Sequence, residues 1–306
     1  MKNKNLLGTG LLLLTAIIWG TAFAFQREGM DHIEPVTFTA SRMSLAAIVI
    51  GLISLAQKTP SDIKTSEEKK AYTKNTLIGG ICCGAFLASA SLFQQIGIVY
   101  TTAGKAGFIT ALYILLVPIL SFFLLKKKNT WLVWCAVFVG LIGMFLLCMT
   151  DDLRLTHGDA LVACCAVFFS GHILCCDHFT KIGNPIRISA IQFAVTALVS
   201  WIIAFITESP NIAQMQEAMV AIVYCGIVSG GIGYTLQMIA LRYSDPTVAS
   251  LLMSFESVFA VLAGSIMLNE HMSTKEIAGC VIMFVAIILV QIPVKGRNKE
   301  ADNSGK

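Results

Sequence analysis

Long apolar runs separated by short polar stretches recur along the whole chain. Each run has about 20 residues, the length that an α-helix needs to cross the roughly 30 Å hydrocarbon core of a bilayer. Backbone polar groups cannot face lipid unpaired, so such runs are expected to be helical. The pattern predicts an all-α integral membrane protein with ten transmembrane helices, at about 6–25, 35–56, 76–97, 104–125, 131–149, 159–179, 188–206, 218–240, 247–268 and 276–293.

The same ten runs form two copies of a five-helix unit. At a constant separation of 143 positions, four residues of the first copy match four of the second: Gln94, Tyr100, Thr101 and Ala106 correspond to Gln237, Tyr243, Ser244 and Ala249. Because five crossings are an odd number, the second copy must enter the membrane upside down. The sequence therefore predicts two inverted repeats around a central cavity, helices 1–5 in 6–149 and helices 6–10 in 159–293, an organisation typical of transporters.

Composition and charge add an orientation. The chain is 56% hydrophobic and 13% charged, with a mean hydropathy of +0.76, whereas soluble proteins carry about 25% charged residues. Seventeen basic residues lie on the N-terminal side of the predicted bundle, and the opposite loops hold only Arg27, Arg154 and Lys275. This bias predicts a plasma-membrane protein with both termini, the loop 57–75 and the tail 294–306 in the cytoplasm. No basic patch outside the membrane flanks indicates a nucleic-acid partner.

The first run also has features of a signal peptide. Lys2 and Lys4 precede a leucine-rich segment, and Ala22-Phe23-Ala24 could be a cleavage site. The run is long for a signal peptide, however, and its removal would leave the first repeat with four helices. We therefore interpret it as an uncleaved first span.

Two charged residues inside the predicted spans are the main candidates for function. Arg42 lies about two turns into the second span, and Glu256 lies close to the middle of the ninth. A charge at the membrane centre costs at least about 2.5 kcal/mol on insertion scales, so each needs a partner or a wet cavity. The two could pair with each other, or Glu256 could be protonated and couple transport to protons. A structural ion pair or hydrogen bond is the alternative.

Further polar residues within the spans are candidates for the same site. Tyr113 corresponds to Glu256 at the separation of 143 residues, and Pro118 is expected to weaken the helix that carries Tyr113. His172 could bind substrate or carry a proton, although a neutral, hydrogen-bonded core histidine is the more common case. Gln94, Gln95, Gln192 and Gln237 add hydrogen-bonding groups. The pairs Gly80/Gly84 and Gly226/Gly230 are expected to let helices approach closely.

Ten cysteines raise the question of disulfides or metal binding. All of them lie within apolar runs, where cysteine acts as a small hydrophobic residue. No metal-ligand spacing is present, and no metal or cofactor is expected. The group His172, Cys175, Asp177 and His178 leaves an intramembrane enzyme as the alternative function.

The residues in these spans resemble the EamA-type transporters of the drug/metabolite transporter superfamily. The resemblance rests on Trp19-Gly20, Arg42, the segment Tyr243–Thr247, the Val258–Ala260 segment after Glu256, and Asn269-Glu270. It implies ten helices in two EamA repeats, export of amino acids or other small metabolites, and a substrate site that includes Trp19. Ser257 stands where the family often has proline, which leaves the helix geometry there open. Gln192 stands where the repeat would place a partner to Arg42.

These observations favour a secondary-active exporter of amino acids or similar small metabolites that works by alternating access. No G-x-x-x-x-G-K-[ST] motif or nucleotide-sized loop is present to couple transport to ATP. A channel is disfavoured because its pore usually needs repeated subunits. The expected partners are a small-molecule substrate and the lipid bilayer. The sequence leaves open whether protons are coupled, whether the chain forms a homodimer, and which substrate is carried.

Overall fold

The computed structural model describes residues 2–57, 60, 63, 65–101, 103–126, 129–148, 156–267 and 273–291. Its elements in the first half are α1 (Lys2–Gly29), α2 (Pro35–Leu55), α3 (Ser66–Val99), α4 (Ala103–Ala111), α5 (Tyr113–Leu125) and α6 (Trp131–Cys148). The second half contains α7 (His157–Ile182), α8 (Pro185–Thr207), α9 (Ile212–Glu217), α10 (Met219–Val223), the π-helix η1 (Tyr224–Tyr234), α11 (Thr235–Leu241), α12 (Pro246–Met253), α13 (Glu256–Met267) and α14 (Thr274–Gln291).

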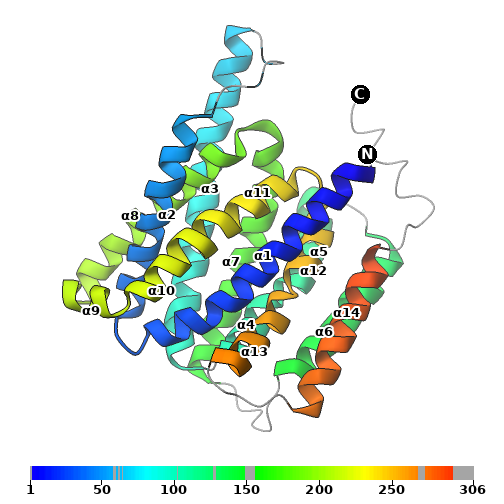
Figure 1. Ribbon diagram of the computed structural model, residues 1–306. Coiled ribbons are helices and arrows are strands. Elements are labelled where there is room, and N and C mark those ends of the chain that lie inside the picture. Colours follow the sequence, from blue (N-terminus) through cyan, green and yellow to red (C-terminus); the bar gives the residue numbers. More distant parts are fainter. Residues whose placement is uncertain are drawn as a thin grey trace.

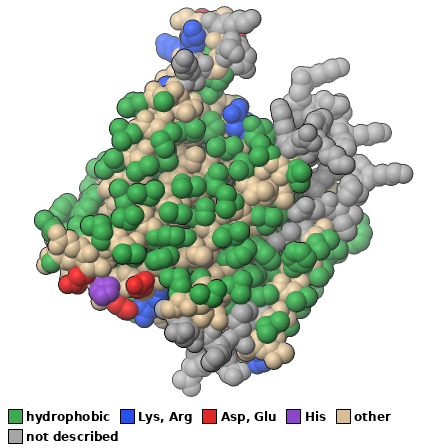
Figure 2. All heavy atoms as spheres, viewed as in Figure 1, with side chains coloured by type: hydrophobic (Ala, Val, Ile, Leu, Met, Phe, Trp, Pro, Cys, Tyr) green, Lys and Arg blue, Asp and Glu red, His purple; other side chains and the backbone are tan. Residues whose placement is uncertain are grey.

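The predicted all-α membrane fold is confirmed. In the described parts of the chain, eight helical segments are long and apolar enough to cross a membrane, and Trp131–Leu146 and Ile277–Ala286 are shorter apolar helices. Figure 2 shows hydrophobic side chains over the broad middle of one face, with charged side chains gathered towards two ends. An apolar middle between charged ends is the surface that a bilayer requires.

Short local signals set several helix ends. Pro35 and Pro185 open α2 and α8, where a missing N–H group is tolerated. Thr65 and Glu68 form a capping box at the start of α3. As a result α3 begins at Ser66, and the second half of the segment 57–75, expected to be a loop, is helical instead. The sequence reading missed this cap because it assigned the polar stretch by composition.

Glycine pairs let helices approach closely, as predicted, and the helices in contact belong to different repeats. A Cβ atom on Gly84 of α3 would lie 3.0 Å from the carbonyl oxygen of Gln192 in α8, and one on Gly226 of η1 would lie 2.8 Å from that of Arg42 in α2. Arg42 and Gln192 are the corresponding residues of the two halves. The same close approach to a backbone carbonyl is therefore made twice. A helix of the first repeat approaches one of the second at Gly84, and a helix of the second approaches one of the first at Gly226.

Two spans are broken at corresponding positions near their middle. The fourth span divides into α4 and α5 at Leu112, and the ninth divides into α12 and α13 at Ser254-Phe255, so that Tyr113 and Glu256 each begin a new helix. The break in the fourth span lies before Pro118, which is inside α5. In the ninth, Ser254 and Ser257 each donate a hydrogen bond of 2.8 Å to a carbonyl three residues earlier. Such side-chain hydrogen bonds compete with the backbone hydrogen bonds of an α-helix. The helix therefore breaks here although Ser257 stands where EamA-type transporters often have proline.

The helices are arranged with the broken spans inside. Figure 1 shows α6 and α14 side by side at one edge, and α2, α3 and α8 together at the opposite edge. Helices α1 and α7, η1, and the broken pairs lie between them. The largest buried cluster, which includes Phe23, Tyr113, Phe169, Tyr234 and Met253, fills this middle region.

Candidate functional site

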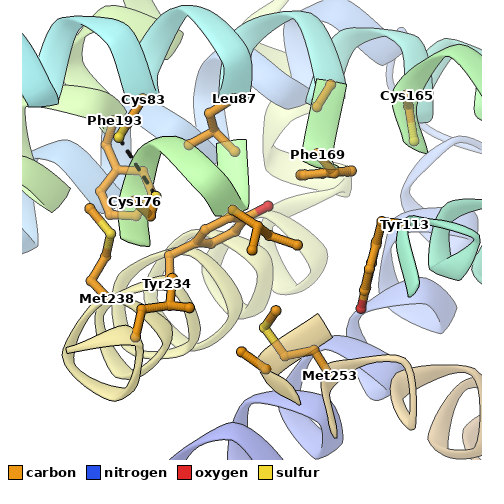
Figure 3. Packing of buried hydrophobic residues seen from close by; sticks show 14 of the residues in the cluster. Cys83, Leu87, Tyr113, Cys165, Phe169, Cys176, Phe193, Tyr234, Met238 and Met253 are labelled. Atoms are coloured by element: carbon orange, nitrogen blue, oxygen red, sulfur yellow. Dashed lines mark hydrogen bonds between the residues drawn. The ribbon is translucent and has the colours of Figure 1, made fainter. Parts of the chain in front are cut away.

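A small polar cavity lies where the two repeats meet. It has a volume of about 30 Å³, which is room for about two water molecules. Its lining comes from both halves: Trp19, Ala22, Phe23, Gln26, Arg42, Gln94, Thr110, Tyr113, Phe169, Ser229, Tyr234 and Glu256. Figure 3 shows Tyr113, Phe169 and Tyr234 converging on this space from different helices.

Glu256 is bound by the residue that corresponds to it in the other repeat. The Tyr113 hydroxyl donates a hydrogen bond of 2.9 Å to Glu256 Oε1, and both side chains are buried. Both residues follow directly after a helix break, so their backbones are held at the centre of the bundle. A contact between corresponding residues of two inverted halves can occur only close to the pseudo-twofold axis. The Tyr113–Glu256 hydrogen bond therefore marks where the pseudo-twofold axis that relates the two halves passes through the bundle.

Arg42 faces the cavity without a partner. The residue is 4% exposed, and no described residue accepts a hydrogen bond from its guanidinium group or forms an ion pair with it. The guanidinium carbon lies 5.6 Å from the centre of the Phe38 ring, a cation–π contact. An ion pair between Arg42 and Glu256 was one of the two alternatives left open by the sequence, and it is not formed in this structure, where the Tyr113 hydroxyl binds the Glu256 carboxyl group. Two ionisable groups thus line one cavity without neutralising each other.

The π-helix η1 forms one wall of the cavity through Ser229 and Tyr234. Trp19 Nε1 donates a hydrogen bond of 3.2 Å to the Ser229 carbonyl oxygen, and its ring centre lies 4.6 Å from that of Tyr234. Gly233 permits this approach, since a Cβ there would lie 2.7 Å from Trp19 Nε1. π-Helices are rare and are frequent at functional sites. The corresponding residues of the first half, 81–91, lie within the uninterrupted helix α3.

A second hydrogen-bonded group supports the wall between α3 and α4. Gln94 Nε2 donates to Thr110 Oγ1 at 3.1 Å, and Thr110 Oγ1 lies 3.5 Å from the Cys165 thiol of α7. Gln26, near the end of α1, is buried, and its Oε1 atom has no hydrogen-bond partner in the described structure. The cavity therefore contains an unpaired hydrogen-bond acceptor, Gln26 Oε1, and an unpaired hydrogen-bond donor, the Arg42 guanidinium group.

His172 and Gln237, also predicted as site residues, lie outside the cavity lining. His172 is fully buried and shares a hydrogen bond of 2.9 Å with Gln192, and its ring packs edge-on against Tyr234 with centres 5.8 Å apart. Gln237 is buried on α11, and its Oε1 atom has no hydrogen-bond partner among the described residues. Both residues are therefore buried polar residues of the second half that do not line the cavity. His172 is one residue away from it, because it packs against Tyr234, which does line the cavity.

The residues of the alternative enzyme hypothesis do not converge. His172 is buried, His178 on the same helix is exposed against Phe179, and Asp177 pairs with Lys181. Cys175 instead contacts Cys83 of α3, with 3.4 Å between the sulfur atoms. Within the described residues, no group of three or more His, Cys, Asp or Glu side chains could hold a metal ion.

Sequence reasoning missed four polar contributors to the cavity: Gln26, Thr110, Ser229 and Tyr234. Gln26 lies just beyond the first predicted span, which ends at about 25, whereas α1 continues to Gly29. Tyr234 carried a usable signal, since a tyrosine within an apolar run needs a hydrogen-bond partner or a polar cavity. Asn269 and Glu270, which support the family resemblance, lie outside the described residues.

The fold is a bundle of long apolar helices with a polar cavity between two inverted halves. Together with the following relatives, which are named as transporters, it defines a multi-pass membrane transporter. The chain belongs to the EamA-like transporter family, whose model matches residues 6–149 and 156–292. An "uncharacterized transporter" of Archaeoglobus fulgidus is 26% identical over 284 residues, covering 92% of this chain and 85% of that protein. The "uncharacterized transporter YoaV" of Bacillus subtilis is 21% identical over 285 residues, covering 92% and 94%.

Two further matches concern half of the chain and the fold. A WAT1-related protein of Arabidopsis thaliana is 24% identical over 156 residues, covering 49% of this chain and 41% of that protein. A solved crystal structure with 18% sequence identity superposes with a TM-score of 0.74, covering 95% of this chain and 97% of that one. The latter similarity shows the same fold.

Proposed function

We propose that the protein is a secondary-active exporter of amino acids or similar small metabolites that works by alternating access. In this proposal it lies in the plasma membrane with both termini in the cytoplasm. The observation that carries the proposal is the pair of ionisable side chains, Arg42 and Glu256, facing one central cavity without pairing to each other.

The polar groups of the cavity match the chemistry of an amino acid. The unpaired guanidinium of Arg42 can donate two hydrogen bonds to a substrate carboxylate. The carboxylate of Glu256 and the amide oxygen of Gln26 can accept hydrogen bonds from an ammonium group. Phe23, Phe169 and Tyr234 supply the apolar and aromatic surface that usually surrounds such polar groups in a ligand site.

The size of the cavity supports a mechanism with moving helices. A space for about two waters is too small for an amino acid, so substrate binding requires the walls to separate. The two breaks, at Leu112 and at Ser254-Phe255, give the inner half-helices freedom to tilt around a fixed centre. Broken helices at the interface of inverted repeats are the usual location of such movements and of the substrate site.

Glu256 is also the candidate for coupling transport to protons. Its hydrogen-bond donor is the neutral hydroxyl of Tyr113, and no described cation lies within ion-pair distance. A buried carboxylate in this setting is costly while charged, so proton binding and substrate binding at Glu256 would compete. Export would then run in exchange for protons entering from the outside.

The proposal is tested by efflux from proteoliposomes loaded with a panel of labelled amino acids, with and without a pH gradient. Saturable efflux of one compound class is expected, and Glu256→Gln should abolish its response to the gradient by removing the titratable group. Glu217→Gln is the matched control, because the Glu217 side chain is 64% exposed at the end of α9 and should be neutral. Absence of flux for every compound would contradict the amino-acid assignment. Gradient-driven flux that survives Glu256→Gln would remove Glu256 from coupling.

A further inference from the structure

A second, larger pocket lies at the junction of α2, α3 and α8, away from the central cavity. Its volume is about 280 Å³, and its lining is Ser54, Tyr72, Thr73, Thr76, Leu77, Arg187, Ala190 and Ile191. The two pockets have no lining residue in common. Figure 1 shows the three helices together at one edge of the bundle.

The pocket sits at the level where two membrane-spanning helices end. Ser54 is next to the last residue of α2, and Arg187 is the third residue of α8. Helix α3 continues past this level towards its start at Ser66. The pocket therefore opens at the boundary between the apolar core and the polar headgroups, at the end of the bundle that carries the N-terminus of α3.

One side of the pocket is cationic. Arg187 is half-buried, and its Nη2 donates a hydrogen bond of 2.7 Å to the Gln57 carbonyl oxygen, which leaves further guanidinium N–H groups to donate to a ligand. Arg187 lies in the first turn of α8, where the helix dipole favours an anion. Lys69 lies one turn before Thr73 on the same face of α3, and the Thr73 hydroxyl donates to its carbonyl oxygen at 2.9 Å.

The acidic residues of the same segment are directed elsewhere. Glu68 accepts a hydrogen bond from the Thr65 amide in the capping box at the start of α3. Glu67 lies about 120° around the helix from Thr73, at roughly 100° per residue. The charge beside the pocket is therefore positive, although the segment as a whole carries both signs.

The other side of the pocket is aliphatic and continuous with the lipid-facing surface. Leu77 is 52% exposed, and Ile78 and Ile81 on the same helix are exposed as well. Ile191 packs against Gly80 of α3, which closes the floor between α3 and α8. A small soluble anion would use the arginine alone, and an uncharged lipid would use the aliphatic wall alone. A ligand that uses both must be an amphiphile with a negative headgroup.

We propose that this pocket binds an anionic phospholipid, with its phosphate at Arg187 and an acyl chain along Leu77 and Ile191. Basic pockets between membrane helices are a recurring way of binding such headgroups. Because Arg187 also binds Gln57, two residues beyond the end of α2, the lipid stabilises the contact between α2 of the first repeat and α8 of the second. Binding of this lipid is independent of the substrate that the central cavity takes.

The test is native mass spectrometry and thermal unfolding of the full chain in detergent, with phosphatidylglycerol, phosphatidylcholine or inorganic phosphate added. Phosphatidylglycerol is expected to stay bound and to raise the Tm by several degrees, whereas the other two should have little effect. Arg187→Gln should weaken phosphatidylglycerol binding about tenfold, the cost of losing a charge-assisted hydrogen bond. Arg242→Gln, at an exposed arginine in the turn before α12, is the matched control.

Leu77→Gln separates this effect from loss of the Arg187–Gln57 bond, since it alters the aliphatic wall and leaves the arginine in place. It is expected to weaken phosphatidylglycerol binding severalfold without lowering the Tm of the lipid-free protein. Equal stabilisation by phosphatidylcholine, or by inorganic phosphate alone, would overturn the proposal. So would undiminished phosphatidylglycerol binding in folded Arg187→Gln protein.

Discussion

At the scale of single residues, the polar groups of the central cavity have unequal roles. Tyr113 holds Glu256 at the pseudo-twofold axis, and Trp19 fixes the wall formed by η1 through the Ser229 carbonyl. Arg42 makes no comparable hydrogen bond, and its one contact of this kind in the described structure is the cation–π contact with Phe38. A buried cation that contributes no internal hydrogen bond destabilises the fold. In the proposed function, the substrate supplies the hydrogen-bond partner that Arg42 lacks.

Arg42→Gln is therefore expected to impair substrate binding and leave the protein folded. The KM for transport should rise about tenfold or more, because a charge-assisted hydrogen bond to the substrate is lost. The measurement is concentration-dependent efflux from proteoliposomes, together with the Tm of the purified variant. Arg27→Gln is the control, since Arg27 forms an exposed i,i+4 pair with Asp31 at 3.2 Å. An unchanged KM in Arg42→Gln would show that the arginine does not contact the substrate.

At the scale of elements, close helix contacts hold the broken spans in place. A Cβ atom on Gly20 of α1 would lie 2.3 Å from Phe259 Cβ and 2.6 Å from the Glu256 carbonyl oxygen. Helix α1 thus packs directly on the first turn of α13, the turn that presents Glu256. Of the Trp19-Gly20 motif, the glycine gives α1 its close approach to α13, and the tryptophan binds η1. Both contacts position residues of the cavity.

Gly20→Ala is expected to destabilise the protein by about 1–3 kcal/mol, the usual cost of overpacking. The added methyl group meets backbone atoms, which cannot move aside as a flexible side chain can. Gly10→Ala on the same helix is the matched control, because a Cβ there would meet nothing within 4 Å. Thermal unfolding in detergent should show a loss of several degrees for Gly20→Ala and little change, or a small gain, for Gly10→Ala. Equal Tm values for the two variants would contradict the contact.

At the scale of the whole molecule, the two repeats share a plan but differ in conformation. The glycine contacts of α3 with α8 and of η1 with α2 are made in corresponding ways. The third span, however, is a continuous α-helix, and the corresponding eighth span contains the π-helix η1. Two identical halves would leave the centre open equally to both sides. The two halves are thus not conformationally equivalent at these spans.

The orientation of the whole molecule can be tested by labelling intact cells with a membrane-impermeant maleimide. The excess of basic residues predicts that a cysteine at Asp31, between α1 and α2, reacts from outside. A cysteine at Lys70 of α3 should react only after the membrane is permeabilised. Both positions are exposed, so access depends on sidedness alone. The unmodified chain gives the background from the native cysteines. The opposite pattern would reverse the orientation, and with it the proposed direction of export.

The sequence by itself determined the class of protein and the outline of its fold. Hydrophobic length specifies a membrane span without reference to any neighbour, and a constant separation of 143 residues reveals duplication wherever the helices finally pack. The free-energy cost of placing a charge in lipid singled out Arg42 and Glu256, again without reference to their neighbours. These are properties of one segment at a time.

Only the tertiary structure decided which of the polar residues share a cavity. It placed Tyr113, rather than Arg42, against Glu256, and it placed His172 behind Tyr234 with Gln192 as its partner. It also introduced η1, a π-helix that contacts Trp19 of α1 and the backbone of α2. Lateral neighbours in a membrane bundle are chosen by the fit of small residues and by shared hydrogen bonds, which apolar periodicity along a single helix does not encode.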